Sequence, residues 1–174
     1  MAMFANSFEN LNDLFVFELK DLYDAEHQIT EALPKMKEAA TNPQLKLAFE
    51  SHLRETQNHV RRLEQVFSQI GCQPERETCA AMKGLISEGQ GMINAKGNNT
   101  VRDAGLISAA QRVEHYEMAS YGTVRTLAQQ LGFMDVARTL QQTLDEEGNA
   151  DKKLTSIAQS SVNVTSPQGE PMNA

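Results

Sequence analysis

Hydrophobic residues recur at steps of three and four along most of the chain, the spacing that places side chains on one face of an α-helix. This pattern predicts four long helices, over residues 6–40, 43–70, 99–131 and 134–158. The turn at Asn42-Pro43 separates the first two, and Gly132 separates the last two. The long segments show no strand-like alternation, so we predict an all-α protein.

The segment between the second and third helices differs from the rest of the chain. It contains Pro74 and four glycines, which predicts a long connection with a short helix over residues 78–93. Short turns make each hairpin antiparallel, and a long crossover lets the third helix start at the far end. In the first helix, Pro34 predicts a kink or an early end.

These features together predict a ferritin-like four-helix bundle, made of two antiparallel hairpins joined by a crossover that contains a short helix. We assign residues 1–160 to this domain. Residues 161–174 are rich in Ser, Asn and Pro, and we predict a disordered tail there.

Two carboxylates interrupt the apolar stripe of the third helix. Glu114 and Glu117 lie one turn apart on it, and no Lys or Arg shares the stripe. Burying each charge would cost several kcal/mol, as an order of magnitude, unless a cation compensates it. Either one glutamate turns to solvent, or a bound metal ion compensates both. The other helices favour the metal.

Each predicted long helix has an acidic residue near the middle of its inner stripe. Glu26 and Glu55 are 29 positions apart, and Glu117 and Glu147 are 30 apart, so equal arms of two hairpins bring each pair to one level. The two halves thus read as a degenerate repeat. We predict seven metal ligands on these stripes: Glu26, Glu55, His59, Glu114, Glu117, Glu147 and Asp151.

Carboxylates with some imidazole suit Fe or Mn better than a structural zinc ion. Bridging glutamates can hold two metal ions, so the expected cofactor is two Fe or Mn ions per chain, with Fe favoured, acting on O₂ or peroxide. His52 lies on the same stripe as Glu55 and is a weaker candidate ligand. Glu146 neighbours Glu147, and the register favours Glu147 as the inward residue.

The net charge of −7 and the scattered basic residues argue against nucleic acid and anionic membranes as partners. No apolar run reaches membrane-spanning length, and the N-terminus lacks signal-peptide features. Cys72 and Cys79 match no zinc or redox motif, so we interpret them as reduced thiols, with a labile disulfide as the alternative. We expect a cytoplasmic protein.

Four short motifs carry a resemblance to a known family: residues 22–28 (LYDAEHQ), 55–60 (ETQNHV), 113–117 (VEHYE) and 144–147 (LDEE). Over residues 8–158 the chain resembles the YciE/YciF family of bacterial stress proteins. More distantly, the third-helix motif resembles that of rubrerythrin. The resemblance implies a ferritin-like bundle, a homodimer and a role in general or oxidative stress defence.

The chain departs from ferritin-like di-iron enzymes at two positions. These enzymes often place His three residues after the glutamate of the second and fourth helices, where this chain has Asn58 and Ala150. His59 and Asp151, one position further, lie on nearly the same face. The chain also lacks the cysteines of a rubredoxin centre.

Our sequence-based hypothesis is a di-metal carboxylate protein that oxidises ferrous iron or removes peroxide. The alternative is a non-enzymatic, stress-induced helical dimer with a degenerate or structural site. Bulk iron storage ranks third, because storage needs a large hollow cage.

Overall fold

The computed structural model describes residues 7–169, which contain helices and connecting turns and no strand. The elements are α1 (Leu11–Ala39), α2 (Pro43–Gln69), α3 (Ala80–Ile93), α4 (Asn99–Gln130) and α5 (Met134–Ile157), then the π-helical turn η1 (Ala158–Val162) and α6 (Asn163–Thr165). The all-α prediction is confirmed. The predicted start of the first helix at Asn6 lies outside the described residues, and α1 begins at Leu11.

Local signals set the helix boundaries. The side chains of Asn10, Asn42 and Asn98 each accept hydrogen bonds from backbone N–H groups in the first turn of α1, α2 and α4. Gly71 and Gly132 follow α2 and α4 with φ of 73° and 84°, a conformation that L side chains rarely adopt. Local sequence signals therefore mark the starts of α1, α2 and α4 and the ends of α2 and α4.

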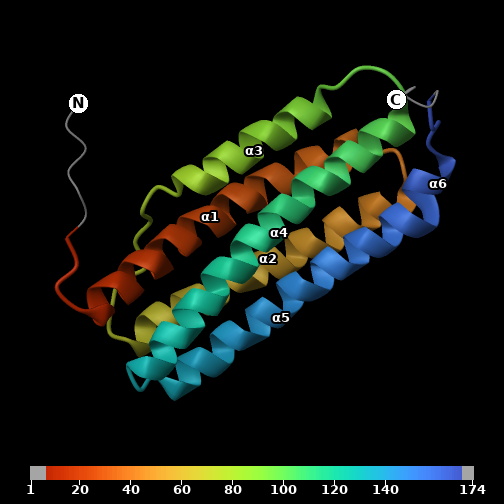
Figure 1. Ribbon diagram of the computed structural model, residues 1–174. Helices are drawn as coiled ribbons and strands as arrows, with labels where there is room; N and C mark the ends of the chain where they lie inside the picture. The colour runs from red at the N-terminus through yellow and green to blue at the C-terminus, as the bar shows by residue number, and fades with distance from the viewer. Residues whose placement is uncertain (1–6, 170–174) are drawn as a thin grey trace, which may run out of the picture.

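The long helices pack side by side as two hairpins, α1 with α2 and α4 with α5 (Figure 1). In addition, α4 lies against α1 and α5 lies against α2. The chain returns along the outside of α1 and α4 through α3, so α4 begins at the end of the molecule where α2 begins (Figure 1). The predicted crossover with a short helix is present.

A buried carboxylate fixes the first hairpin against α4. Asp103 is fully buried and accepts hydrogen bonds from the backbone N–H groups of Thr41 and Asn42, at 2.9 and 2.7 Å. The turn donors that would otherwise be unsatisfied are thereby paired. This contact sets the level of α4 relative to α1 and α2.

The hydrophobic core has two parts. One contains Phe49 and Leu106, and the other contains Phe67 and Tyr121. Apart from Asp103 near the start of α4, the buried polar residues of the four long helices fall between these two parts, near the middle of each helix. The interrupted stripes of the sequence thus become a polar layer between two apolar ones.

The C-terminal stretch differs from the prediction. Residues 158–165 are helical, Val162 is 1% exposed and belongs to the core, and the Ser161 hydroxyl accepts a hydrogen bond from Asn42. The predicted disorder is therefore wrong for residues 161–165, while residues 170–174 lie outside the described part. Of the kink or early end expected at Pro34, the early end is absent, because α1 continues to Ala39.

Both cysteines carry free thiols. Cys79 is buried, and its Sγ accepts a hydrogen bond from the backbone N–H of Met82 at the start of α3. Its Sγ also lies 3.0 Å from the hydroxyl of Tyr116. Burial raises the pKa of this thiol to about 11, so it stays protonated at neutral pH.

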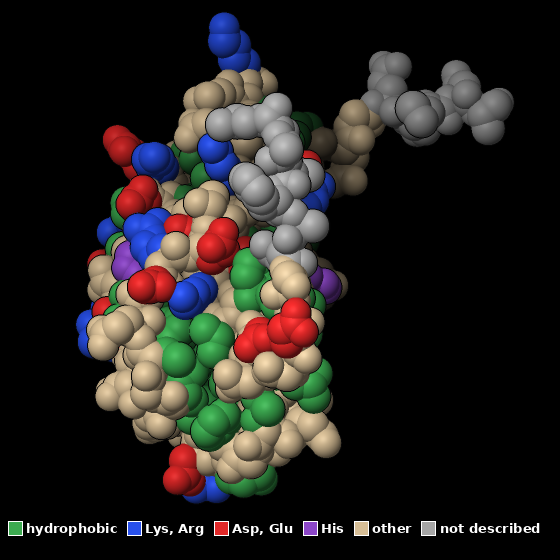
Figure 2. Space-filling view, turned by 90° about the vertical axis from the view of Figure 1, so that its left-hand side faces the viewer, with side chains coloured by type: hydrophobic (Ala, Val, Ile, Leu, Met, Phe, Trp, Pro, Cys, Tyr) green, Lys and Arg blue, Asp and Glu red, His purple; other side chains and the backbone are tan. Residues whose placement is uncertain are grey.

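Lys and Arg side chains alternate with Asp and Glu over part of the face seen in Figure 2, and hydrophobic side chains gather over its lower part. The exposed large hydrophobic side chains include Leu11 and Met134, the first residues of α1 and α5. Within residues 7–169, no helix combines the length and the apolar character needed to cross a bilayer.

Candidate metal centre

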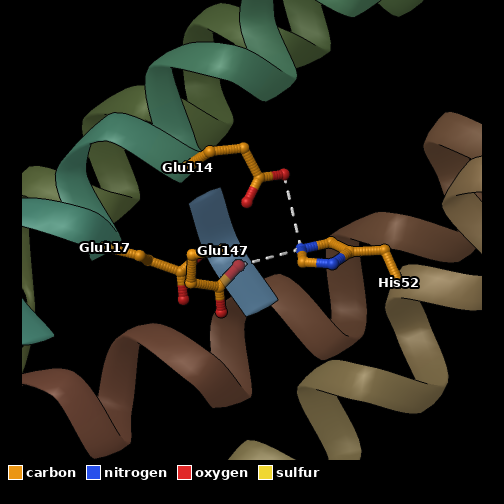
Figure 3. Close-up of side chains that lie close together, drawn as sticks. All are labelled: His52, Glu114, Glu117 and Glu147. Carbon is orange, nitrogen blue, oxygen red and sulfur yellow. Dashed lines mark ion pairs between the residues drawn. The ribbon is translucent and has the colours of Figure 1, made fainter. Parts of the chain in front are cut away.

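Six buried side chains from four helices converge in the polar layer. They form two groups that share one residue: His52, Glu114, Glu117 and Glu147 in the first, and Glu26, His59 and Glu147 in the second. In each group, one ligand atom per residue lies within 4.8 Å of the others. Figure 3 shows the first group, with the three carboxylates facing the imidazole of His52. Glu147 therefore occupies a bridging position.

His52 presents one ring nitrogen to the carboxylates. Its Nε2 lies 3.4 Å from Oε1 of Glu114 and 3.7 Å from Oε2 of Glu147. Its Nδ1 lies 3.4 Å from Oε2 of Glu55 on the outer side. The hydrogen bond with His52 keeps the pKa of Glu55 below its usual value, so that ionised carboxylate can only accept. Nδ1–H therefore donates outward, and Nε2 faces the centre.

His59 repeats this arrangement in the second group. Its Nδ1 lies 2.9 Å from Oε1 of Glu147 and 3.4 Å from Oε1 of Glu26. Its Nε2 donates to Glu146 over 2.8 Å, and the Arg62 guanidinium binds both oxygens of Glu146 at 2.6 and 2.8 Å. Histidine ligands of metals are commonly oriented in this way by a carboxylate on the other ring nitrogen.

The inward atoms of the centre make no regular hydrogen bond within residues 7–169, and the contact between His59 and Glu147 is an ion pair. These atoms are Oε2 of Glu26, Nε2 of His52, Nδ1 of His59, Oε2 of Glu114 and both carboxylate oxygens of Glu117 and of Glu147. Buried polar atoms are normally paired, and each orphan costs about 1–3 kcal/mol. A donor set of carboxylates and imidazoles, all aimed at one small volume, fits divalent metal ions.

The pKa values of the clustered side chains also favour a site for a cation. Burial raises the pKa of Glu26, and raises those of Glu114 and Glu117 well above the usual value. Burial would lower the pKa of His59, but Glu147 and Glu26 outweigh it and raise that pKa to about 11. The cluster therefore holds protons where a cation would otherwise sit, and metal binding would release them.

Two residues of the predicted ligand set, Glu55 and Asp151, lie outside the group of six converging side chains. The inward orientation predicted for Glu55 is wrong, because its side chain is 42% exposed and supports His52 from outside. The buried face of α2 runs instead through His52, Thr56 and His59. Asp151 is 20% exposed and accepts a hydrogen bond from Gln111 at the outer edge of α4.

The structure adds residues that the sequence reasoning ranked low or missed. His52 is seven positions before His59, which is close to two full helical turns, and that spacing signals a shared face. Glu146 and Arg62 act together behind His59, and no local pattern marks that pairing. Tyr121 donates a hydrogen bond to Glu26, and the sequence analysis did not include it in the site.

A pocket of about 150 Å³ lies between α2 and α5 and reaches the centre. His52 and Glu114 line its inner part, and Glu55 and Lys153 line its exposed part. Its apolar walls include Phe49. The first group of the centre is thus connected to solvent, whereas His59 and Glu26 are fully buried.

The chain matches the family described as a domain of unknown function, DUF892, over residues 10–166. The chain belongs to this family. Protein YciF of Escherichia coli K12 is 47% identical over 156 residues, covering 89% of this chain and 94% of YciF. All six converging residues lie within the family's span.

Three solved structures are similar to this chain. The crystal structure of the E. coli stress protein YciF matches with a TM-score of 0.87 at 46% identity, over 90% of this chain and 99% of that one. YcfI from Rhodopseudomonas palustris gives 0.86 at 44%, with the same coverage. A Xanthomonas campestris protein, 21% identical, gives 0.70 over 88% and 94% and shares the fold.

Proposed function

We propose that this protein is a ferritin-like four-helix bundle that holds two Fe or Mn ions and acts in general or oxidative stress defence. It would oxidise ferrous iron or remove peroxide. The observation that carries the proposal is the set of inward carboxylate and imidazole atoms without hydrogen-bond partners, arranged in two groups around Glu147. The name of the stress protein YciF supports the physiological setting.

The six converging residues would hold the two ions in an inner and an outer position. Glu147 would bridge the two ions, Glu26 and His59 would complete the inner position, and His52 would complete the outer one with Glu114 and Glu117 on α4. Two such ions can exchange electrons with O₂ or peroxide. Apolar layers lie on both sides of the carboxylates, and the outer hydrogen bonds fix both imidazole rings.

A purely structural metal site is the second candidate. Its support is that all four long helices contribute a ligand, so bound ions would cross-link the molecule. A structural site would raise stability without turnover. The two functions therefore differ in their kinetics, not in their metal content.

Turnover assays on protein reconstituted with Fe or Mn test the proposal. We expect the wild type to oxidise ferrous iron or consume peroxide catalytically, and Glu147→Gln to lose at least 100-fold in rate, as an order of magnitude, with loss of the bridging ligand. The matched control is Asp145→Asn, because Asp145 is exposed on the same helix and bonds only to Gln141. A metal-loaded wild type without turnover would leave the structural role.

A further inference from the structure

The pocket beside the centre has a size and a lining that hydrogen peroxide and O₂ do not require. Its volume is about 150 Å³. A molecule the size of water occupies about 30 Å³ in the liquid, whereas an apolar protein cavity of about 150 Å³ accommodates benzene. The pocket therefore fits a compact organic molecule of about six non-hydrogen atoms.

The lining separates an apolar wall from a polar end. Ala48, Phe49 and Leu154 contribute hydrophobic surface, with Ala150 beside them on α5. The inner end holds Nε2 of His52, a nitrogen without a hydrogen-bond partner. Pockets that combine apolar walls with a few converging polar groups are typical of small-molecule sites.

We infer that this pocket binds small organic hydroperoxides and thereby sets the substrate class of the centre. The alkyl group would lie against Phe49 and Leu154, and the O–O end would face His52 and Glu114. The inference rests on the proposed function for the chemical step alone. Cleaving the O–O bond takes two electrons and two protons and yields an alcohol and water. Each of two bound divalent ions would give one electron, solvent would give the protons, and an added one-electron reductant such as ascorbate would return both ions to the divalent state for the next turnover.

The alanine walls allow the pocket to be filled without touching a ligand. Ala150 is half-buried on α5, so Ala150→Phe places a ring in the pocket and leaves all six converging residues unchanged. Ala119→Phe is the matched control, because Ala119 is an exposed alanine inside α4. Circular dichroism of both variants verifies folding before the comparison.

Binding is measured first on metal-free protein, by saturation-transfer NMR with tert-butyl alcohol, the product of tert-butyl hydroperoxide. We expect transfer to the alcohol in the wild type and in Ala119→Phe, and its loss in Ala150→Phe. Absence of transfer in the wild type, or equal transfer in Ala150→Phe, would overturn the inference. This result does not depend on whether the centre binds metal.

Specificity is measured next on the metal-loaded protein. We expect the wild type to prefer tert-butyl hydroperoxide over the bulkier cumene hydroperoxide by about 10-fold or more in kcat/KM, as hydrophobic pockets discriminate by size. Ala150→Phe should keep its metal and should lose far more of its rate with tert-butyl hydroperoxide than of its rate with hydrogen peroxide, and equal losses would contradict the inference. Equal rates of the wild type with both organic substrates would contradict the inference, and absence of metal would contradict the proposed function instead.

Discussion

At the scale of single residues, the centre is defined by what holds each imidazole from behind. His52 is oriented by Glu55, and His59 is oriented by Glu146 with Arg62. In both rings the outer nitrogen donates to an ionised carboxylate, so the inner nitrogen is the one that faces the glutamates. A ligand set of this kind depends on residues that do not themselves touch the metal.

Removing the carboxylate behind His59 should weaken metal binding. We expect Glu146→Ala to reduce metal affinity by about 10–100-fold, because the ring loses the partner that fixes its orientation. Glu146→Gln keeps an acceptor and should lose less. Competition with a fluorescent chelator measures these affinities. Asp145→Ala on the neighbouring exposed position is the control, and an unchanged affinity in Glu146→Ala would contradict the assigned role.

Five glutamates were predicted from the sequence to face inward. Four of them do so, and the fifth, Glu55, does not. Glu26, Glu114, Glu117 and Glu147 are buried as their stripes predicted. For Glu55 the error was one of register: positions 52 and 59 differ by seven residues and share a face, whereas position 55 lies about 60° from position 52 and about 40° from position 59 on an ideal helix. Long-range partners such as Arg62 and Glu146 could not be predicted, because their contact depends on how α2 packs against α5.

At the scale of helices, one carboxylate of α1 anchors the segment that leads into α3. Asp24 is buried and accepts hydrogen bonds from the backbone N–H of Cys79, from Gln28 and from Arg76. Burial alone would raise the pKa of Asp24, but these donors outweigh it and hold the pKa below its usual value. Asp24 therefore holds the crossover against α1 as an ionised carboxylate.

This lowered pKa makes part of the stability depend on pH. An unfolded Asp has a pKa of about 3.9, so the contribution of Asp24 is complete above about pH 5 and is lost as the pH falls through its folded pKa. We expect the free energy of unfolding of the wild type to fall more steeply between about pH 5 and pH 3 than that of Asp24→Asn. Denaturant titrations at several pH values measure both slopes, and parallel slopes would contradict the assignment.

Helix boundaries were predictable where capping residues mark them, and the C-terminal stretch was not. Asn42 and Gly132 carry local signals that act before any tertiary contact forms. Residues 161–165 have a polar composition that is typical of disorder. They are helical because Val162 reaches the core and Ser161 bonds to Asn42, and neither contact is visible in the local sequence.

At the scale of the whole molecule, the fold places a charged layer between two apolar ones. The metal-free state must hold its protons and leave ligand atoms unpaired, which costs stability. A cation that binds only the folded state adds stability by mass action. Metal binding at the proposed centre would therefore be coupled to the stability of the fold.

That coupling predicts a thermal shift. At a metal concentration about 100 times Kd, binding adds about 2.7 kcal/mol, which for a chain of this length raises Tm by roughly 5–10 °C. We expect this shift with Fe²⁺ or Mn²⁺ in the wild type and in Asp145→Asn, and a much smaller one in Glu147→Gln. Calorimetry of chelator-treated protein measures it, and equal Tm values with and without metal would contradict the coupling.

The most direct measurement is the metal content per chain of protein purified without chelator, for the wild type and for Glu147→Gln, by elemental analysis. The two ligand groups that share Glu147 predict about two Fe or Mn ions per wild-type chain and a clear loss in the variant. A wild type that holds no metal, and takes up none when Fe or Mn is supplied, would contradict the di-metal centre.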